Sequence, residues 1–388
     1  PPSLLPTSSL TSARLNPPLN RLPAIYPNIT CPPSPSPDRL FYPPLVIRNS
    51  PLGLQYDKLP AMQRHFIEFT TPDTALMMTD TLATPAKNEV LINVHHSGVN
   101  RADLLQRLGL YPPPTDASPI PGLEVAGEVV AIGEAVTYCS IGDRVCALAH
   151  GGGYASAAIV REDHCLLLPD TLSSEQGAAL PEALLTVWYN VFERGLLARN
   201  ETALIHGGSS GIGSLGIQMV RAMGATALST AGSQERCAAV TNLGAEFVAN
   251  HSEGDLLEQF KEAGYAEQIN VILDIAGGDI MQANLELAAP DGRIVCIGVM
   301  RGMQSEINLA TLFMKRLTLT GSTLRRLDTA SRAACFQAIR EHIWPEVLAG
   351  NILPVIDSSF PLADVLAAHE YMRSGRHFGK LLLACQVS

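Results

Sequence analysis

The chain has 388 residues, of which 46% are hydrophobic and 16% charged, a balance typical of a compact enzyme long enough for two domains. Its formal net charge of −10 argues against nonspecific binding to nucleic acid or membranes, and no apolar run approaches the roughly 18 residues of a membrane helix. The eight cysteines are scattered without a C-x-x-C pair, which indicates free thiols in a reducing compartment and predicts a cytoplasmic protein.

Residues 1–61 differ in composition from the rest of the chain. They hold 15 of the 28 prolines and show no amphipathic period, so we expect this extension to be disordered and without function. We do not expect a secretory signal, because no continuous apolar core follows a basic start. Arg14, Arg21 and Arg39 occur among few acids, which leaves a transit peptide open beside a mis-assigned start or a low-complexity tail.

From Met62 onward the pattern predicts short strands. Residues 89–100 alternate between apolar and polar side chains, as in a half-buried strand. Residues 122–133 form a second such segment, and a turn with a further strand follows at 141–145. Short alternating strands rich in glycine indicate a small barrel-like domain.

From about Gln176 the pattern changes to alternating strands and helices, which predicts a parallel, doubly wound sheet. The expected strands are 202–206, 225–230, 270–274, 292–298 and 317–321. The tail predicts a helix over 330–348, a strand near Ile356, a helix over 363–373 and a strand over 379–383. A barrel interrupted by a nucleotide-binding domain explains strands at both ends, and we expect the barrel at 62–182 and 323–388 and the inserted domain at 183–322.

A glycine-rich turn joins the strand 202–206 to the helix after it. Glycine allows tight turns and close approach of a pyrophosphate, and the N-terminus of the helix offers free N–H groups to the anion. The pattern fits in two registers, Gly211-x-Gly213-x-x-Gly216 and Gly208-x-Ser210-x-x-Gly213. We favour the second, because the phosphate-binding turn must directly follow the strand. A plain strand-to-helix turn is the alternative.

The end of the next strand bears on the choice between NADPH and NADH. NAD-binding folds usually place an acid there for the ribose hydroxyls, and this strand instead runs into Gly232 and Ser233, with Arg236 close behind. A hydroxyl and a guanidinium suit a 2′-phosphate, which favours NADPH. Alternatively, Ser233 caps a helix and Arg236 is a surface charge. Glu235 lies nearby and leaves NADH open.

Seven short motifs in order carry a resemblance to a known family. They are NRADLLQR (100–107) with YPPP (111–114), GLEVAG (122–127), LPEALLTVW (180–188), SSGIG (209–213), TAGS (230–233), GSTLR (321–325) and HFGK (377–380). From Met62 to Leu383 the chain resembles the zinc-free quinone oxidoreductase branch of the medium-chain dehydrogenase/reductase superfamily. It looks closest to the tumour-suppressor-inducible NADPH quinone oxidoreductase subgroup. The resemblance implies a GroES-like β-barrel catalytic domain interrupted by a Rossmann cofactor domain.

The resemblance also predicts a site without metal. Zinc enzymes of this superfamily have cysteine in the region of Asn100 and histidine at the position of Leu123, and a leucine side chain cannot ligate Zn²⁺. The four-cysteine structural lobe is missing as well. Substrates that need a Lewis acid are therefore poor candidates, and the expected acceptor is already electrophilic, such as a small quinone or an activated alkene.

The resemblance places three residues, Asn100, Asp103 and Tyr111, at the nicotinamide as candidate catalytic groups. The Tyr111 hydroxyl is a candidate donor to the acceptor oxygen, and Asn100 would orient amide or carbonyl groups. Because quinones need little acid catalysis, we expect Tyr111 to contribute modestly. Alternatively, Tyr111 packs a loop, and Asp103 caps or ion-pairs on the short helix that follows Asn100.

The cofactor-binding residues also follow from the resemblance. Thr186 is expected at the nicotinamide, with Asn100 beside it, and Gly232, Ser233 and Arg236 at the 2′-phosphate. The pyrophosphate is assigned to Gly208, Ser209, Ser210, Gly211, Ile212 and Gly213, and the nicotinamide half is closed by Ser322, Leu324 and Lys380. His251 stands where the family often has tyrosine, and it either contacts the phosphate, which makes NADPH affinity more pH-dependent, or is inert.

These observations together predict an NADPH-dependent quinone reductase that acts as a homodimer. An NADPH-dependent enone or enoyl-thioester reductase on the same scaffold is the alternative among enzymes. A non-catalytic, nucleotide-binding role, like the lens-crystallin and RNA-binding uses of relatives, is the alternative outside them. The acidic composition counts against RNA, because RNA binding depends on basic surface.

Overall fold

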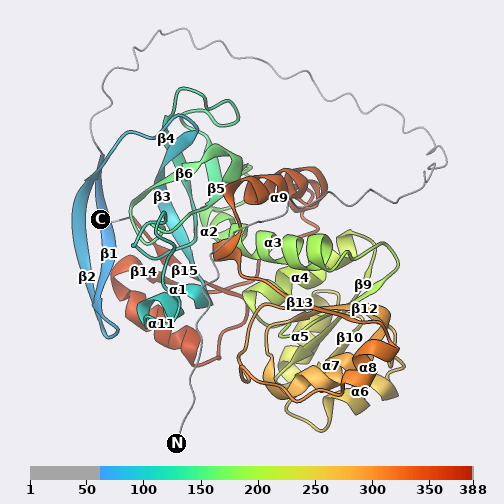
Figure 1. Ribbon diagram of the computed structural model, residues 1–388. Helices are drawn as coiled ribbons and strands as arrows, with labels where there is room; N and C mark the ends of the chain where they lie inside the picture. Colours follow the sequence, from blue (N-terminus) through green and yellow to red (C-terminus); the bar gives the residue numbers. More distant parts are fainter. Residues whose placement is uncertain (1–61, 387–388) are drawn as a thin grey trace, which may run out of the picture. The chain divides into compact units, whose positions relative to one another are not determined.

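The computed structural model describes residues 62–386, and the proline-rich extension, with the disorder expected of it, lies outside this range. The described strands form a seven-stranded sheet, a six-stranded sheet and a two-stranded hairpin (Figure 1). Among the helices between residues 62 and 386, none combines the length and the apolar character needed to cross a membrane.

The seven-stranded sheet belongs to the barrel-like part and has the order β14-β15-β3-β4-β5-β7, with β6 paired to β3. Its strands are β3 (Glu89–Val99), β4 (Glu124–Ile132), β5 (Arg144–Leu148), β6 (Ala157–Arg161), β7 (Cys165–Leu167), β14 (Ile356–Pro361) and β15 (Lys380–Ala384). Alternate residues of β3, Val90, Ile92 and Val94, lie in one buried core, as the alternation in the sequence predicts. The two strands from the end of the chain therefore join a sheet made mostly from its first half.

The hairpin pairs β1 (Met62–Thr71) with β2 (Thr74–Leu82). Ile67 of β1 is fully buried in the barrel core, and its N–H donates to the carbonyl of Tyr154. The helix α1 (Arg101–Arg107) follows β3 directly, and η1 (Glu162–His164) links β6 to β7. Gly122 has a φ of +97°, and the strand predicted from 122 begins instead at Glu124, after this turn.

The six-stranded sheet is parallel throughout, with the order β10-β9-β8-β11-β12-β13. Its strands are β8 (Thr202–Ile205), β9 (Thr226–Ala231), β10 (Phe247–Asn250), β11 (Ile269–Asp274), β12 (Ala288–Cys296) and β13 (Thr318–Gly321). The connections carry α4 (Gly211–Ala222), α5 (Gln234–Asn242), α6 (Leu256–Glu262), η3 (Gly278–Ile280), α7 (Met281–Leu287) and α8 (Leu309–Met314). This is the doubly wound sheet that the sequence predicts.

Successive side chains of β8 in this sheet pack into two different hydrophobic cores. Ala203 and Ile205 of β8 pack with Leu215 of α4, whereas Leu204 between them packs with Phe260 of α6 and Leu285 of α7 (Figure 1). Successive side chains of a strand point to opposite faces, so a sheet covered on both faces needs continuous apolar runs. The short apolar strands of the sequence meet that requirement.

The remaining helices lie between the two large sheets in chain order, except η5 (Leu362–Asp364) and α11 (Val365–Arg373), which link β14 to β15. The others are α2 (Ser174–Ala178), α3 (Pro181–Val187), the π-helix η2 (Trp188–Arg194), η4 (Leu324–Arg326), α9 (Thr329–His342) and α10 (Trp344–Leu348). The single helix predicted over 330–348 is wrong, because the chain bends at Ile343 between α9 and α10. Pro345 has no N–H for the hydrogen bond that a continuous helix would make there.

Candidate active site

The glycine-rich turn between β8 and α4 is close-packed at the positions of one of its two registers. A Cβ atom on Gly208 would lie 2.3 Å from Ser229 Oγ, and one on Gly213 would lie 2.2 Å from the carbonyl oxygen of Gly207. A Cβ on Gly216 would instead meet its nearest atom, Cγ2 of Val187, at 3.4 Å, an ordinary contact. Gly211 is also tight, because its Cβ would lie 2.3 Å from Lys380 Cδ, and Gly213 belongs to both registers. The packing therefore favours the register Gly208-x-Ser210-x-x-Gly213 only through the open position at Gly216.

The same turn fits a pyrophosphate group. Gly207 has a φ of +71°, and Ser210 caps α4 by accepting the N–H of Gly213 at 2.9 Å. The helix is 12 residues long, so its N-terminus carries the partial positive charge that stabilises a bound anion. The residues assigned to the pyrophosphate from the sequence therefore form one cradle, in which side chains on the tight glycines would occupy the space of the turn.

The residues assigned to the 2′-phosphate lie where β9 ends and α5 begins. Ser233 caps α5 and accepts the N–H of Arg236 at 3.2 Å, as the alternative reading had it. Arg236 is more than a surface charge, because its Nη2 donates to the carbonyls of Gly375 (2.8 Å), Arg376 (2.7 Å) and His377 (3.2 Å). Part of this guanidinium thus holds the loop that leads into β15.

His251 packs against the backbone at the same place. A Cβ on Gly232 would lie 3.0 Å from Cε1 of the His251 ring. Burial lowers the pKa of His251, and the nearby charges of Arg301 and Arg236 lower it further, so the ring is neutral at pH 7. The neutral ring contributes no positive charge to phosphate binding, unless a bound phosphate raises the pKa of His251.

A buried ion pair joins β15, β4 and the start of α1. Lys380 Nζ donates to Glu124 Oε1 at 2.5 Å and to Asn100 Oδ1 at 2.6 Å, while Asn100 Nδ2 donates to Glu124 Oε1 at 2.8 Å. The Lys380 and Glu124 side chains are 5% and 0% exposed. A Cβ on Gly98 would lie 2.1 Å from Glu124 Oε1, so glycine is needed beside this carboxylate. Both ends of the Asn100 amide are engaged here.

Asp103 lies one turn further on and is completely buried. Its carboxylate accepts the N–H of Asn100 (2.9 Å), the N–H of Gly122 (3.1 Å) and the hydroxyl of Tyr154 (3.2 Å). Burial raises the pKa of Asp103 to about 6, and the three donors work against that shift. The bond from the Asn100 N–H is part of the capping box of α1, so the structure favours the capping role that the sequence left open for Asp103.

The ring of Tyr111 lies against a guanidinium. Arg325 of η4 stacks over the Tyr111 ring with its Cζ 4.3 Å from the ring centroid. It also donates to the Tyr111 carbonyl and to the Gln106 side chain of α1. Within residues 62–386 the Tyr111 hydroxyl makes no hydrogen bond, so it remains available to a ligand.

Thr186 of α3 is nearly buried and connects several of the expected cofactor residues. Its hydroxyl Oγ1 is 3.2 Å from Glu182 Oε1, and its carbonyl accepts from Asn190 Nδ2 at 2.8 Å. Asn190 in turn accepts from Ser322 Oγ at 2.6 Å. The N–H of Glu182 donates to Glu124 Oε2 at 2.9 Å, so a continuous set of bonds runs from Lys380 to Ser322.

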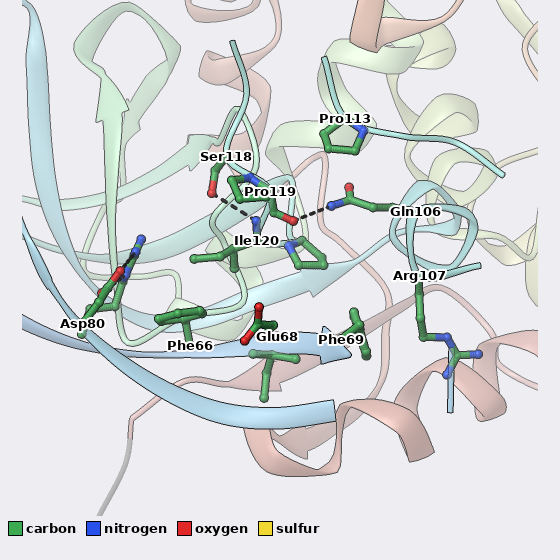
Figure 2. Close-up of a pocket in the computed structure, with 13 residues that line it drawn as sticks. Phe66, Glu68, Phe69, Asp80, Gln106, Arg107, Pro113, Ser118, Pro119 and Ile120 are labelled. Atoms are coloured by element: carbon green, nitrogen blue, oxygen red, sulfur yellow. Dashed lines mark hydrogen bonds and ion pairs between the residues drawn. The ribbon is translucent and has the colours of Figure 1, made fainter. Parts of the chain in front are cut away.

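A hollow of about 550 Å³ is lined by the last residues of α1, the hairpin and the loop around Pro119. Figure 2 shows Gln106 reaching from α1 to the Pro119 carbonyl, which its Nε2 meets at 2.9 Å. The other end of the Gln106 amide accepts from Arg325. Gln106 therefore joins the wall of this hollow, which includes Phe66 and Phe69, to the guanidinium that covers Tyr111.

Comparison with known proteins identifies the family. Residues 86–170 match the model of the alcohol dehydrogenase GroES-like domain, and residues 211–341 match that of the zinc-binding dehydrogenase. Quinone oxidoreductase of Rattus norvegicus is 32% identical over 81% of this chain and 95% of its own length. Quinone oxidoreductase 1 of Escherichia coli is 31% identical over 80% of this chain and 96% of its own. The chain belongs to the medium-chain dehydrogenase/reductase superfamily.

Solved structures of the superfamily superpose on most of the chain. The Escherichia coli quinone oxidoreductase complexed with NADPH has a TM-score of 0.72 and 29% identity, covering 83% of this chain and 100% of that one. The CurK enoyl reductase has a TM-score of 0.72 and 25% identity, covering 83% and 99%. The expected GroES-like domain with an inserted Rossmann domain is confirmed, and the protein is an oxidoreductase of the quinone oxidoreductase type that binds a nicotinamide cofactor.

Sequence reasoning missed several charged residues of the site. Glu124, Glu182 and Arg325 stand inside the motifs GLEVAG, LPEALLTVW and GSTLR, and their charge in otherwise apolar or small-residue runs was a usable signal. Tyr154 and His369 stand in none of these motifs. Tyr154 donates to Asp103, and a hydrogen bond of 3.0 Å joins its hydroxyl to His369 Nε2 from α11.

Proposed function

We propose that the protein is an NADPH-dependent quinone reductase that passes hydride to a small quinone without a metal ion. The observation that carries the proposal is the position of Lys380 between the glycine cradle and the Asn100 cluster. A Cβ on Gly211 would lie 2.3 Å from Lys380 Cδ, so the lysine stem packs directly on the N-terminus of α4. A cofactor in the cradle would thus extend toward Lys380, Asn100 and Thr186.

In this proposal the bound cofactor, NADPH, supplies the hydride, and the protein binds and orients the reactants. Thr186 and Asn100 would orient the nicotinamide half, with Ser322, Leu324 and Lys380 closing over it. Tyr111 and Arg325 offer a flat, cationic wall with a free hydroxyl, which suits an aromatic acceptor whose oxygen gains negative charge. Asp103 acts as a positioning residue in this scheme.

Independence from zinc is part of the proposal. Leu123 has no ligating atom, and both polar atoms of the Asn100 amide are bonded to Glu124 and Lys380. We also propose that the protein belongs to the zinc-free branch and to its tumour-suppressor-inducible subgroup, on the seven motifs given above. A cytoplasmic location fits the seven free cysteines of the described chain.

The preference for NADPH rests on the end of β9. No acid stands at the strand tip, and Gly232, Ser233 and His251 line the place where a 2′-phosphate would lie. Arg236 supplies positive charge there while it holds the loop 375–377. The NADPH complex of the Escherichia coli relative supports the same cofactor.

An enone or enoyl-thioester reductase is the second candidate. The CurK enoyl reductase superposes with the same TM-score as the Escherichia coli quinone oxidoreductase, 0.72. Both activities need hydride at one carbon and a proton elsewhere, so the acceptor decides between them.

The first experiment measures anaerobic oxidation of NADPH, and of NADH in parallel, with ortho- and para-quinones and an α,β-unsaturated ketone. We expect turnover with a quinone and a strong preference for NADPH. Turnover of the ketone alone would establish the second candidate. NADPH binding without any turnover would point to the non-catalytic role, and failure to bind NADPH would refute the proposal at its first step.

We also propose that the protein is a homodimer, joined at the free edge of β13. The segments around this edge strand expose large apolar side chains, among them Met300 (61%), Met303 (89%), Phe313 (63%) and Met314 (71%). Exposed apolar groups beside an unpaired strand edge mark an association surface. Light scattering should give twice the chain mass, and a monomer at micromolar concentration would contradict the proposal.

A further inference from the structure

The carboxyl groups of Glu124, Asp103 and Glu182 lie near the ammonium of Lys380, and they differ in how well they are bonded. Glu124 and Asp103 are fully buried, whereas Glu182 is partly buried. Glu124 accepts from Lys380 and Asn100 at Oε1 and from the N–H of Glu182 at Oε2. Asp103 accepts from two N–H groups and a hydroxyl. Within the described residues the Glu182 carboxyl has one hydrogen bond, at 3.2 Å to the Thr186 hydroxyl, and its Oε2 atom is buried without a hydrogen-bond partner.

The number of hydrogen-bond donors to each carboxyl group indicates which of the three holds a proton. An ionised carboxylate is acceptor-only, so Glu124 and Asp103, with three donors each, suit the charged form. A charged Glu182 would leave a buried oxygen with no donor, which is unfavourable, whereas the acid form lowers that cost. Geometry alone therefore favours a carboxylic acid at Glu182.

The electrostatic surroundings agree with the geometry. Burial raises the pKa of Glu182 to about 7, Lys380 of β15 works against this shift, and the charges of Glu124 on β4 and Asp103 on α1 add to it. The hydrogen bond between Glu182 and Thr186 can run in either direction, because a hydroxyl and a protonated carboxyl each donate and accept.

We propose that Glu182 holds the proton that quinone reduction consumes and passes it to the acceptor through the Thr186 hydroxyl. This rests on the proposed function. The overall reaction takes one hydride and one proton into the quinone to give a hydroquinone. As the acceptor oxygen becomes negative, the Thr186 hydroxyl proton moves to it, the Glu182 proton moves to Thr186 Oγ1, and Glu182 is left as a carboxylate. Solvent then reprotonates Glu182.

The first test needs no activity. Infrared difference spectra of the cofactor-free protein should show the C=O band of a protonated carboxylic acid, which disappears as pH rises through about 7. The band should be missing in Glu182→Gln and present in Glu128→Gln, a control on the exposed face of β4. Asp103→Asn separates any contribution from Asp103. A band absent from the wild-type protein, or unchanged in Glu182→Gln, would overturn the proposal.

The second test uses the pH dependence of quinone reduction. Wild-type kcat should fall as pH rises above about 7, because only protonated Glu182 can pass a proton. Glu182→Gln and Thr186→Val should each lower kcat about 100-fold, the low end for a positioned proton donor, and lose this pH limb. Thr186→Ser should restore the fall of kcat above about pH 7, because serine keeps the hydroxyl. The double variant Glu182→Gln/Thr186→Val should be no slower than either single variant, since each substitution interrupts the same relay.

The outcomes separate this proposal from the proposed function. If the wild-type protein reduces no quinone, the proposed function fails, and the relay to a quinone fails with it, while the infrared band still reports whether Glu182 is protonated. If the wild-type protein reduces quinones and Glu182→Gln keeps the pH limb, the relay alone is refuted. A purely structural role for Glu182 would lower stability and leave the shape of the pH profile unchanged.

Discussion

Replacement of Lys380 by methionine is expected to lower the free energy of unfolding by about 3–5 kcal/mol, the usual effect of removing one partner of a buried ion pair. Lys380 and Glu124 are 5% and 0% exposed, and the lysine is the sole cation bonded to this carboxylate in the described chain. Methionine keeps the volume of the stem against Gly211 but leaves Glu124 charged and buried. Urea denaturation monitored by circular dichroism measures the difference.

Two further variants test whether the effect comes from the buried charge. Lys261→Met removes a surface partner of Glu258, where the side chains are 40% and 60% exposed, and should leave stability almost unchanged because an exposed ion pair contributes little. Adding Glu124→Gln to Lys380→Met removes the uncompensated charge and should recover most of the loss. A Lys380→Met protein as stable as Lys261→Met would show that the pair contributes nothing to the fold.

The sequence predicted the sheets well because their pattern is local. Apolar alternation in β3 and continuous apolar runs in β8 and β11 follow from which faces are buried, and each run is visible within a few residues. The register favoured for the glycine turn was argued from its distance to the end of β8, and it stays a prediction that the variants Gly213→Ala and Gly216→Ala test. The helix after Ala330 was extended too far because Pro345 was not weighed as a break.

The charged part of the site was not accessible in the same way. Lys380 and Glu124 are 256 residues apart, and nothing local to either one shows that they meet. The acid form of Glu182 depends on the absence of a donor at Oε2, which is a property of the packed structure. Arg325 likewise acquires its place over Tyr111 only when η4 returns to the barrel. Family resemblance predicted roles for Asn100 and Thr186 but did not single out Glu124 or Glu182, whose carboxyl groups are hydrogen-bonded to them.

Replacement of Gly213 by alanine is expected to weaken NADPH binding by about 10- to 100-fold or more. The added Cβ would lie 2.2 Å from the Gly207 carbonyl and 2.7 Å from Gly208 Cα, so the backbone of the turn must move. Each charge-assisted hydrogen bond to the pyrophosphate that this movement breaks costs about 1.5–3 kcal/mol, and 1.4 kcal/mol is a factor of ten in affinity. Titration calorimetry with NADPH measures the change.

Gly216→Ala is the matched control, because it lies one turn further along the same helix. Its Cβ would be 3.4 Å from Val187 Cγ2, and alanine favours helix over glycine, so binding should be unchanged and stability equal or higher. The two variants also discriminate between the registers of the turn. If Gly216→Ala weakened NADPH binding as much as Gly213→Ala, the pyrophosphate would be held by the register Gly211-x-Gly213-x-x-Gly216, and the cradle described above would be wrong. If only Gly213→Ala weakens it, the close approach at Gly207 and Gly208 is what holds the cofactor.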